Sequence, residues 1–180
     1  MPEGGWTHAS APYLRPPAAG QADAWTTETA AKGRKGTQRV VRAGEVRASR
    51  EVAELLGLHE AAEVIVRRRV MFLDGEPTEL TDTYYPATIA RGTRLTETSK
   101  IPGGAVTLLA DLGHVAHVVR EVVRARMPDA QERESLAMGA DAPVLTLTRV
   151  TADNQGVPFQ VDVSVFPAAT QELSYERRVD

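Results

Sequence analysis

The feature of this 180-residue sequence that most restricts its fold is an internal repeat of two strand–turn–strand segments, 64–86 and 144–167. The second copy carries one extra residue in its turn. Three motif pairs correspond: Arg69-Val70 with Arg149-Val150, Gly75-Glu76-Pro77 with Gly156-Val157-Pro158, and Tyr85-Pro86 with Phe166-Pro167. β-Branched runs on either side of Gly-containing turns are typical of β-hairpins. The repeat therefore predicts two similar hairpins in one pseudo-symmetric antiparallel sheet.

Helix signals lie between and around the hairpins. Ser49 is a candidate N-cap for a short helix that Gly57 ends, and Asp129 with Glu132 forms a capping box for a helix through Met138. Further elements are expected over 105–112 (helix), 115–125 (strand) and 173–177 (short strand). These patterns predict an α+β fold, with an antiparallel sheet and flanking helices, that starts near Arg42.

Strand alternation assigns the two faces of the hairpins, because successive side chains point to opposite sides. Phe159, Val161, Val163 and Val165 form one apolar face, which we expect in the core. The opposite face carries polar groups from both hairpins: Glu79, Thr81, Thr83, Gln160, Asp162 and Ser164, with Arg69 and Arg149 close by. This face is either an ordinary solvated surface or, if helices or loops cover it, the wall of a site for a small polar or anionic ligand.

The charge of the chain is unevenly distributed. The segment 32–50 carries seven basic residues and one acidic residue, a local sum of +6 within a chain of net charge −3. This segment is either a mobile, solvated linker or an electrostatic contact for an acidic partner such as DNA. The preceding segment, 1–31, is rich in Pro, Gly, Ala and Thr, and its Trp6, Tyr13 and Trp25 follow no helical or strand period. We expect an arm that cannot form a core alone and that docks through its tryptophans.

Catalytic and metal-binding patterns are scarce. The sequence has no cysteine, no long apolar run and no secretion signal, so we expect a cytosolic protein without disulfides or a membrane span. His114 and His117 lie three apart on an expected strand and so face opposite sides, and no cofactor motif is present; neither a metal nor a cofactor is expected. Gly103-Gly104 before a helix is either an anion site or a tight entry turn. Within Arg67-Arg68-Arg69, we expect Arg68 to point away from the other two, and a structural salt-bridge ladder is one explanation of the triplet.

Several of these runs together resemble a known family. They are 64–70 (VIVRRRV), Asp74-Gly75-Glu76-Pro77, 82–86 (DTYYP), 51–57 (EVAELLG), 103–109 (GGAVTLL) and 143–149 (PVLTLTR), followed by Gly156-Val157-Pro158. In this combination and order the sequence resembles the UTRA domain, the effector-binding domain of GntR-type (HutC-type) bacterial transcription regulators, similar in fold to chorismate pyruvate-lyase. The match extends from about Arg42 to the C-terminus and is greatest to actinomycete members such as those of Streptomyces.

The resemblance implies a six-stranded antiparallel sheet, a homodimer and a pocket for a small effector. The family's pocket positions fall on Arg69, Thr81, Thr83, Gly104, Ala105, His114 and Gln160, and the sheet-face pattern adds Asp162. Three positions depart from the family: Met71 replaces a second arginine, Gly104 a serine and Val106 a tyrosine. Because sugar-phosphate-binding members use those residues on the phosphate, we expect a smaller or less charged effector.

Family members carry an N-terminal winged helix-turn-helix, but nothing in 1–31 has the periodicity of one. We therefore divide the chain into a flexible arm or linker, 1–41, and a UTRA domain, 42–180. The expected function is non-enzymatic effector sensing, with DNA bound only through a module outside this chain. Two alternatives stay open: a chorismate-lyase-like enzyme, with Arg69 and Arg149 binding carboxylates and Glu79 or Asp162 as general acid, and a ligand-free dimerisation or interaction domain.

Overall fold

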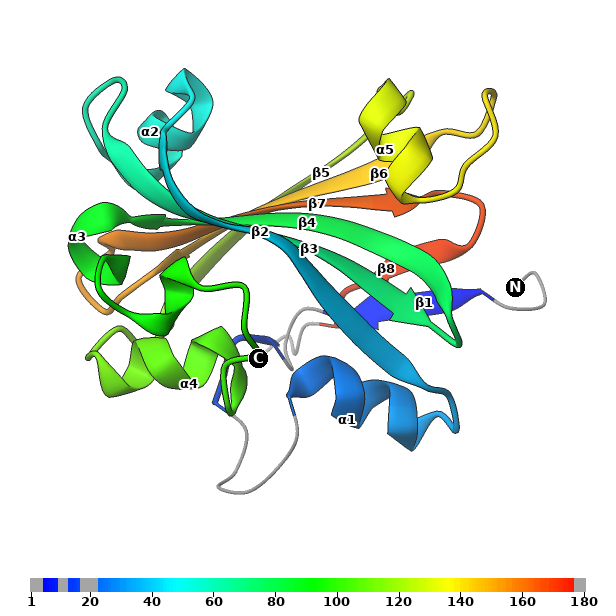
Figure 1. Ribbon diagram of the computed structural model, residues 1–180, viewed down its shortest axis with the longest axis horizontal. Helices are drawn as coiled ribbons and strands as arrows, with labels where there is room; N and C mark the ends of the chain where they lie inside the picture. Colours follow the sequence, from blue (N-terminus) through cyan, green and yellow to red (C-terminus); the bar gives the residue numbers. More distant parts are fainter. Residues whose placement is uncertain (1–4, 10–12, 17–22, 177–180) are drawn as a thin grey trace.

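The computed structural model describes residues 5–9, 13–16 and 23–176, and its centre is a strongly twisted six-stranded sheet (Figure 1). The strands are β2 (Gly36–Arg47), β3 (Glu63–Leu73), β4 (Glu76–Pro86), β5 (Val118–Arg126), β6 (Val144–Ala152) and β7 (Pro158–Pro167). Their order is β2-β3-β4-β7-β6-β5, and every neighbouring pair is antiparallel. The predicted α+β class and six-stranded antiparallel sheet are confirmed.

The internal repeat is larger than the two hairpins. Each half of the sheet is a strand, a short helix and a hairpin: β2, α2 (Arg50–Leu56), β3 and β4 in one half, and β5, α5 (Ala130–Ser135), β6 and β7 in the other. Both helices begin at the predicted caps, since Ser49 accepts from the Val52 amide and Asp129 forms a complete capping box with Glu132. The second helix ends at Ser135 rather than Met138, because Ala137 has a left-handed backbone (φ 51°).

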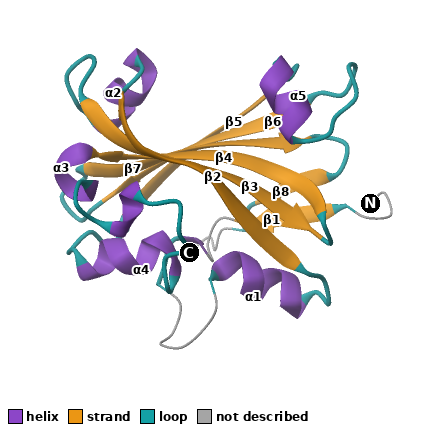
Figure 2. Ribbon diagram, in the orientation of Figure 1, coloured by secondary structure: helices purple, strands orange, loops and turns teal. Residues whose placement is uncertain are grey.

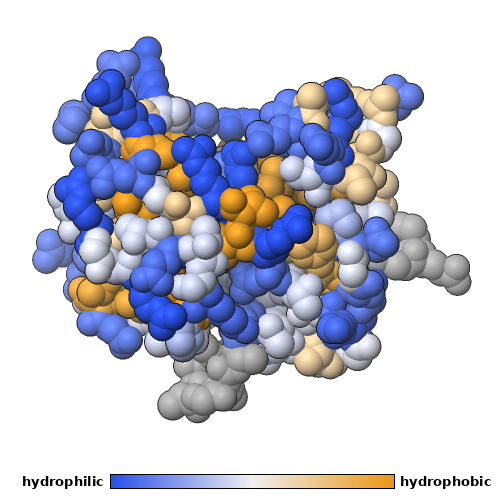
Figure 3. Space-filling view, in the orientation of Figure 1, coloured by the Kyte–Doolittle hydropathy of each residue, from blue (hydrophilic) through white to orange (hydrophobic). Residues whose placement is uncertain are grey.

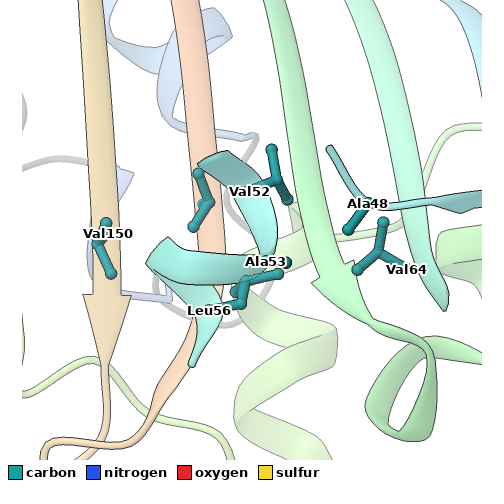
Figure 4. Packing of buried hydrophobic residues seen from close by; sticks show 7 residues of the cluster. Ala48, Val52, Ala53, Leu56, Val64 and Val150 are labelled. Atoms are coloured by element: carbon teal, nitrogen blue, oxygen red, sulfur yellow. The ribbon is translucent and has the colours of Figure 1, made fainter. Parts of the chain in front are cut away.

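One face of the sheet is covered by α2 and α5, which lie on the same side of it in Figure 1. Beneath α2, Val52, Ala53 and Leu56 pack on Val64, Val150 and Val161 (Figure 4). At the α5 end, a second buried cluster contains Leu136 and Val165 with Val70, Leu80 and Val144. Burying an aliphatic side chain of this size contributes about 1.5–3 kcal/mol, so this face supplies much of the fold's stability. We call it the apolar face.

Phe159 is an exception to the predicted alternation. Val161, Val163 and Val165 lie on the apolar face as expected, but Phe159 packs on the other side with Tyr85 and Leu109. The cause is a register shift between β6 and β7 at Thr151 and Ala152. Thr151 pairs with Gln160 and Ala152 with Pro158, so Phe159 is the extra residue of a bulge and its side chain lies on the same face as that of Gln160.

The opposite face, which we call the cavity face, is covered by α4 (Gly104–Asp111), α3 (Ala87–Ala90), a short 3-10 helix (Arg94–Thr96) and the N-terminal segment (Figure 2). That segment contains strand β1 (Trp6–Ala9), paired in parallel with β8 (Gln171–Ser174), and helix α1 (Ala24–Ala31). Neither β1 nor α1 was predicted. The last strand, expected over 173–177, occupies 171–174.

The basic segment also differs from expectation. A mobile linker was one of the two alternatives for this segment, but β2 spans Gly36–Arg47 and pairs with β3 along its length. Residues 36–41 of the predicted arm or linker, 1–41, are therefore in the sheet. The exposed side chains of β2 include Arg39, Arg42 and Arg47, and charged residues on an edge strand discourage pairing with another chain. Because these charged residues are typical of a solvated linker, the sequence did not predict a strand here. In Figure 3 this side of the molecule is mostly hydrophilic, with apolar side chains gathered near its middle.

Candidate functional site

A partly enclosed cavity of about 120 Å³ lies between the cavity face of the sheet, the start of α4 and the N-terminal segment. On the same measure a single water needs roughly 10–15 Å³, so the cavity has room for several waters or a small molecule. Six of the eight predicted site residues line it: Arg69, Thr81, Gly104, Ala105, Gln160 and Asp162. They come from β3, β4, β7 and α4.

The other two predicted residues lie beside the cavity. Thr83 is 1% exposed and contacts two residues of the cavity wall. It accepts a hydrogen bond from Arg69 Nη2 (3.0 Å) and donates one to Asp162 Oδ1 (2.7 Å). His114 lines a smaller neighbouring hollow together with Phe159, Leu109 and Gln160, and its ring packs at 5.6 Å from the Phe159 ring. His114 is therefore placed next to the cavity rather than in its wall.

Strand register explains why the floor of the cavity is a connected polar network. Thr81 pairs with Ser164 and Thr83 with Asp162 across the junction of β4 and β7, where the two halves of the repeat meet. The Thr81 and Ser164 hydroxyls are 2.8 Å apart, and Thr81 also donates to Glu79. Gln160 Nε2 donates to Asp162 Oδ2 (2.7 Å). The network keeps buried polar groups hydrogen-bonded, which limits their cost to folding.

Arg149 lies at the same floor and is 7% exposed. Its Nε donates to Glu121 at 2.6 Å. Burial alone would lower the pKa of Arg149, but attraction to Asp162, Glu121 and Glu79 raises it above the ordinary value. Arg149 is thus a permanent cation facing several carboxylates.

The N-terminal segment forms the roof of the cavity, through His8, Tyr13, Asp23, Ala24 and Trp25. The Trp25 indole donates to the carbonyls of Thr37 and Phe72, which fastens α1 to the edge of the sheet. The Trp6 ring packs edge-on against Trp25, and both tryptophans are 3% exposed. The expected docking of the arm through its tryptophans is therefore observed.

Tyr13 completes the roof from a short described stretch. Its ring stacks on His8 at 5.0 Å, and its hydroxyl donates to Glu28 at 2.7 Å. Burial, together with the Glu28 carboxylate, raises the pKa of Tyr13 well above its ordinary value, so the side chain stays neutral. Sequence reasoning missed the roof residues as site residues. The available signal was the presence of large aromatic residues in a segment otherwise rich in Pro, Gly and Ala.

The arginine triplet divides as predicted. Arg68 forms a two-point ion pair with Asp82 (2.7 and 2.6 Å) on the apolar face, whereas Arg67 and Arg69 lie on the cavity face. Arg67 is buried and donates to the carbonyls of Arg94, Leu95, Glu97 and Ser99. Of the three arginines, only Arg68 forms a cross-strand ion pair within the described part of the chain. Arg67 binds the loop before α4, and Arg69 lines the cavity.

The kinds of side chain and helix present also bear on the chemistry of the site. Among the described residues, no three His, Cys, Asp or Glu side chains are grouped so that they could hold a metal ion. In the same part of the chain, no helix is long and apolar enough to cross a membrane. The cavity chemistry consists of hydroxyls, amides, carboxylates and guanidinium groups, which suits reversible binding of a small polar molecule.

The fold and this cavity define an effector-binding domain of the type found in GntR-family transcription regulators. The model of the UTRA domain family matches residues 31–171, and the chain belongs to that family. It is 31% identical over 137 residues to an HTH-type transcriptional regulator of Streptomyces coelicolor, covering 74% of this chain and 51% of that protein. It is 24% identical over 148 residues to the HTH-type transcriptional regulator GgaR of Escherichia coli, covering 80% and 56% respectively.

A solved structure agrees on the fold. PhnF from Mycobacterium smegmatis superposes with a TM-score of 0.76 and 22% identity, over 93% of this chain and 72% of that one. The chain spans about half the length of the curated relatives it matches. Met71, Gly104 and Val106, the three positions at which the sequence was expected to depart from the family, all line the cavity.

Proposed function

We propose that this chain senses a small-molecule effector as part of a GntR-family transcription regulator, without catalysing a reaction. The observation that carries the proposal is the roofed polar cavity at the junction of the two sheet halves. An open polar face would need no cover, whereas here α4 and the N-terminal segment enclose Arg69, Thr81 and Asp162. That the relatives are transcriptional regulators points the same way.

The proposed mechanism is a change in the population of two arrangements. Effector binding favours one geometry of a homodimer, and a winged-helix module outside this chain binds DNA accordingly. The shift is limited by the difference in effector affinity between the two arrangements. We extend this mechanism to the roof: because His8, Tyr13 and Trp25 line the cavity, an effector contacts the segment that leads toward any preceding module. The basic edge strand β2 is a second segment through which effector binding could affect that module.

We also propose that the chain divides into an N-terminal segment and a UTRA domain that includes β2. The proposed location of the protein is the cytoplasm. The test is a thermal-shift screen of the 180-residue chain against a metabolite library, because a ligand that binds only the native state raises the melting temperature. Trp6 and Trp25 are the only tryptophans in the sequence. Since Trp25 lines the cavity, a true effector should also change tryptophan fluorescence.

A control separates cavity binding from binding elsewhere. Thr81→Val removes the hydroxyl that donates to Glu79 and contacts Ser164, so it should abolish most of the ligand-induced shift. Thr148→Val, the same change on the apolar face of β6 opposite Val163, should leave the shift unchanged. If a broad library gives no shift, the chain is an interaction domain rather than a sensor.

The lyase alternative is supported by one observation, namely that Arg69, Glu79, Arg149 and Asp162 share the cavity. Its substrate is a dianion, however, and three carboxylates (Asp23, Glu79, Asp162) line the site against two guanidinium groups. We therefore favour binding without turnover. Incubation with chorismate distinguishes the two, because sustained pyruvate release would overturn the sensor proposal.

A further inference from the structure

The charged side chains of the cavity differ in whether they already have an ion-pair partner. Among the residues that the structure describes, five of them line it: Asp23, Arg69, Glu79, Arg149 and Asp162. Asp23 lies 3.1 Å from Lys100, and Arg149 is paired with Glu121. Over the described part of the chain, Arg69, Glu79 and Asp162 have no oppositely charged group within 4.0 Å. Two carboxylates and one guanidinium therefore face the cavity without an ion pair.

The two carboxylates are deeply buried. Glu79 is 9% and Asp162 5% exposed, and the donors that reach them are neutral: Thr81, Thr83 and Gln160. The nearby Arg149 is shared, since Glu79, Glu121 and Asp162 all act on it. A buried charge is costly unless it is paired as well as hydrogen-bonded. This side of the cavity consequently favours a cation.

Arg69, in contrast, is a cation with an unused hydrogen-bond donor. Its Nη2 donates to Thr83, but its Nε is buried and has no hydrogen-bond partner among the described residues. The first turn of α4, from Gly104 to Val106, lines the same cavity, and a helix N-terminus carries partial positive charge. This side favours an anion. A phosphate dianion would satisfy it but would leave Glu79 and Asp162 sharing Arg149 with Glu121.

We propose that the effector is a small dipolar molecule that carries one ammonium and one carboxylate group. The ammonium is received by Glu79 and Asp162, and the carboxylate by Arg69 with the first turn of α4. This inference rests on the proposed function, since it names the ligand class of the same cavity. The aromatic roof, with Tyr13 and Trp25, covers the apolar part that separates the two charges.

The test uses ω-amino acids of increasing length as probes: glycine, β-alanine, 4-aminobutanoate, 5-aminopentanoate and 6-aminohexanoate. Butylamine and butanoate each lack one of the two charges, and glucose, inorganic phosphate and glucosamine 6-phosphate represent other ligand classes. Binding to the full chain is followed by thermal shift and tryptophan fluorescence. At least one amino acid should bind, with an optimum length that reports the separation of the two poles, and butylamine and butanoate should bind at least tenfold more weakly.

Variants assign the two poles. Glu79→Gln keeps an acceptor for Thr81 but removes the charge. The affinity for the tightest-binding amino acid should fall roughly tenfold or more, which is the usual loss for a hydrogen bond to a charged group. Glu76→Gln, on the exposed start of the same strand, is the matched control and should have no effect. Arg69→Gln should weaken binding of the amino acid and of butanoate but not of butylamine. Because this variant tests the other pole, the inference does not depend on the folding of a single variant.

The outcomes separate the two proposals. If glucose, phosphate or glucosamine 6-phosphate binds more tightly than every amino acid, the sensor function stands and the dipolar class is wrong. If one amino acid binds but Glu79→Gln and Arg69→Gln leave its affinity unchanged, the assignment to this cavity is wrong. If neither the probes nor the metabolite library bind, both proposals fall.

Discussion

The two faces of the central sheet are built from the same strands but from alternate residues, and they are used differently. On the apolar face, Leu56 and Val161 pack without polar partners beneath α2. On the cavity face, Thr83 and Asp162 are equally buried but depend on hydrogen bonds to one another. Apolar packing is stabilising by itself, whereas a buried polar network roughly breaks even for folding. The apolar face is therefore expected to supply most of the stability of the fold, and the polar groups of the cavity face are expected to add little to it.

The largest effect is expected on the apolar face. Leu56→Ala removes a 3%-exposed side chain from the cluster beneath α2, and such truncations cost about 2–5 kcal/mol because they leave a cavity. Urea denaturation should show this loss of unfolding free energy. Val157→Ala, at an exposed turn position, is the control and should stay within about 0.5 kcal/mol. A loss below 1 kcal/mol at Leu56 would mean that this face is not the stabilising one.

Arg67 is an exception among the polar residues of the cavity face, because its role is structural. It donates to four backbone carbonyls of the loop before α4. Arg67→Met should lower the free energy of unfolding by roughly 2–3 kcal/mol, since it removes hydrogen bonds from a charged donor, including the buried one to the Leu95 carbonyl. Arg47→Met, on the exposed side of β2, should cost little. Equal stabilities of the two variants would show that the loop does not depend on Arg67.

A smaller loss is expected from the polar floor itself. Thr83→Val removes the hydroxyl between Arg69 and Asp162 while keeping the volume of the side chain. We expect the free energy of unfolding to fall by about 1 kcal/mol, because both former partners face the cavity, where water can replace the hydroxyl. Chemical denaturation measures this value. A loss as large as that of Leu56→Ala would contradict the division of roles between the faces.

The sequence predicted the sheet well where alternation is regular. Val161 and Val165 on one side and Asp162 and Ser164 on the other follow directly from the pleat, and the repeat correctly implied that Thr81 and Thr83 share the polar face. Phe159 escaped this rule because a register shift is not visible in one strand alone. Strand β2 was missed because its exposed arginines resemble those of a solvated linker.

The roof could not be predicted for a different reason. Trp6 pairs with Gln171 through β1 and β8, residues that are far apart in the sequence, and neither four-residue strand has a pattern that specifies the other. Trp25 is held by carbonyls of Thr37 and Phe72, contacts that exist only once the sheet has formed. The resemblance to a family supplied Arg69 and Gln160 as pocket positions, but it gave no information on Tyr13 or Asp23.

The smallest expected effect concerns acid stability at the rim of the apolar face. Arg126 forms a two-point ion pair with Glu132 (both bonds 2.6 Å) and thereby lowers the pKa of Glu132 below its ordinary value. Because the folded state favours the ionised carboxylate, this stabilisation is fully present above the unfolded pKa of about 4.3 and is lost as pH falls through the lower, folded pKa.

Glu132→Gln removes that charge but keeps a residue suited to the capping box with Asp129. Since Arg126 is partly exposed, the difference in unfolding free energy should be at most about 1 kcal/mol at neutral pH. It should shrink toward zero as the wild-type carboxylate is protonated. Denaturation curves measured from neutral pH to pH values below the folded pKa test this. A difference that stays constant over the whole range would show that the variant acts through the helix cap rather than through the ion pair.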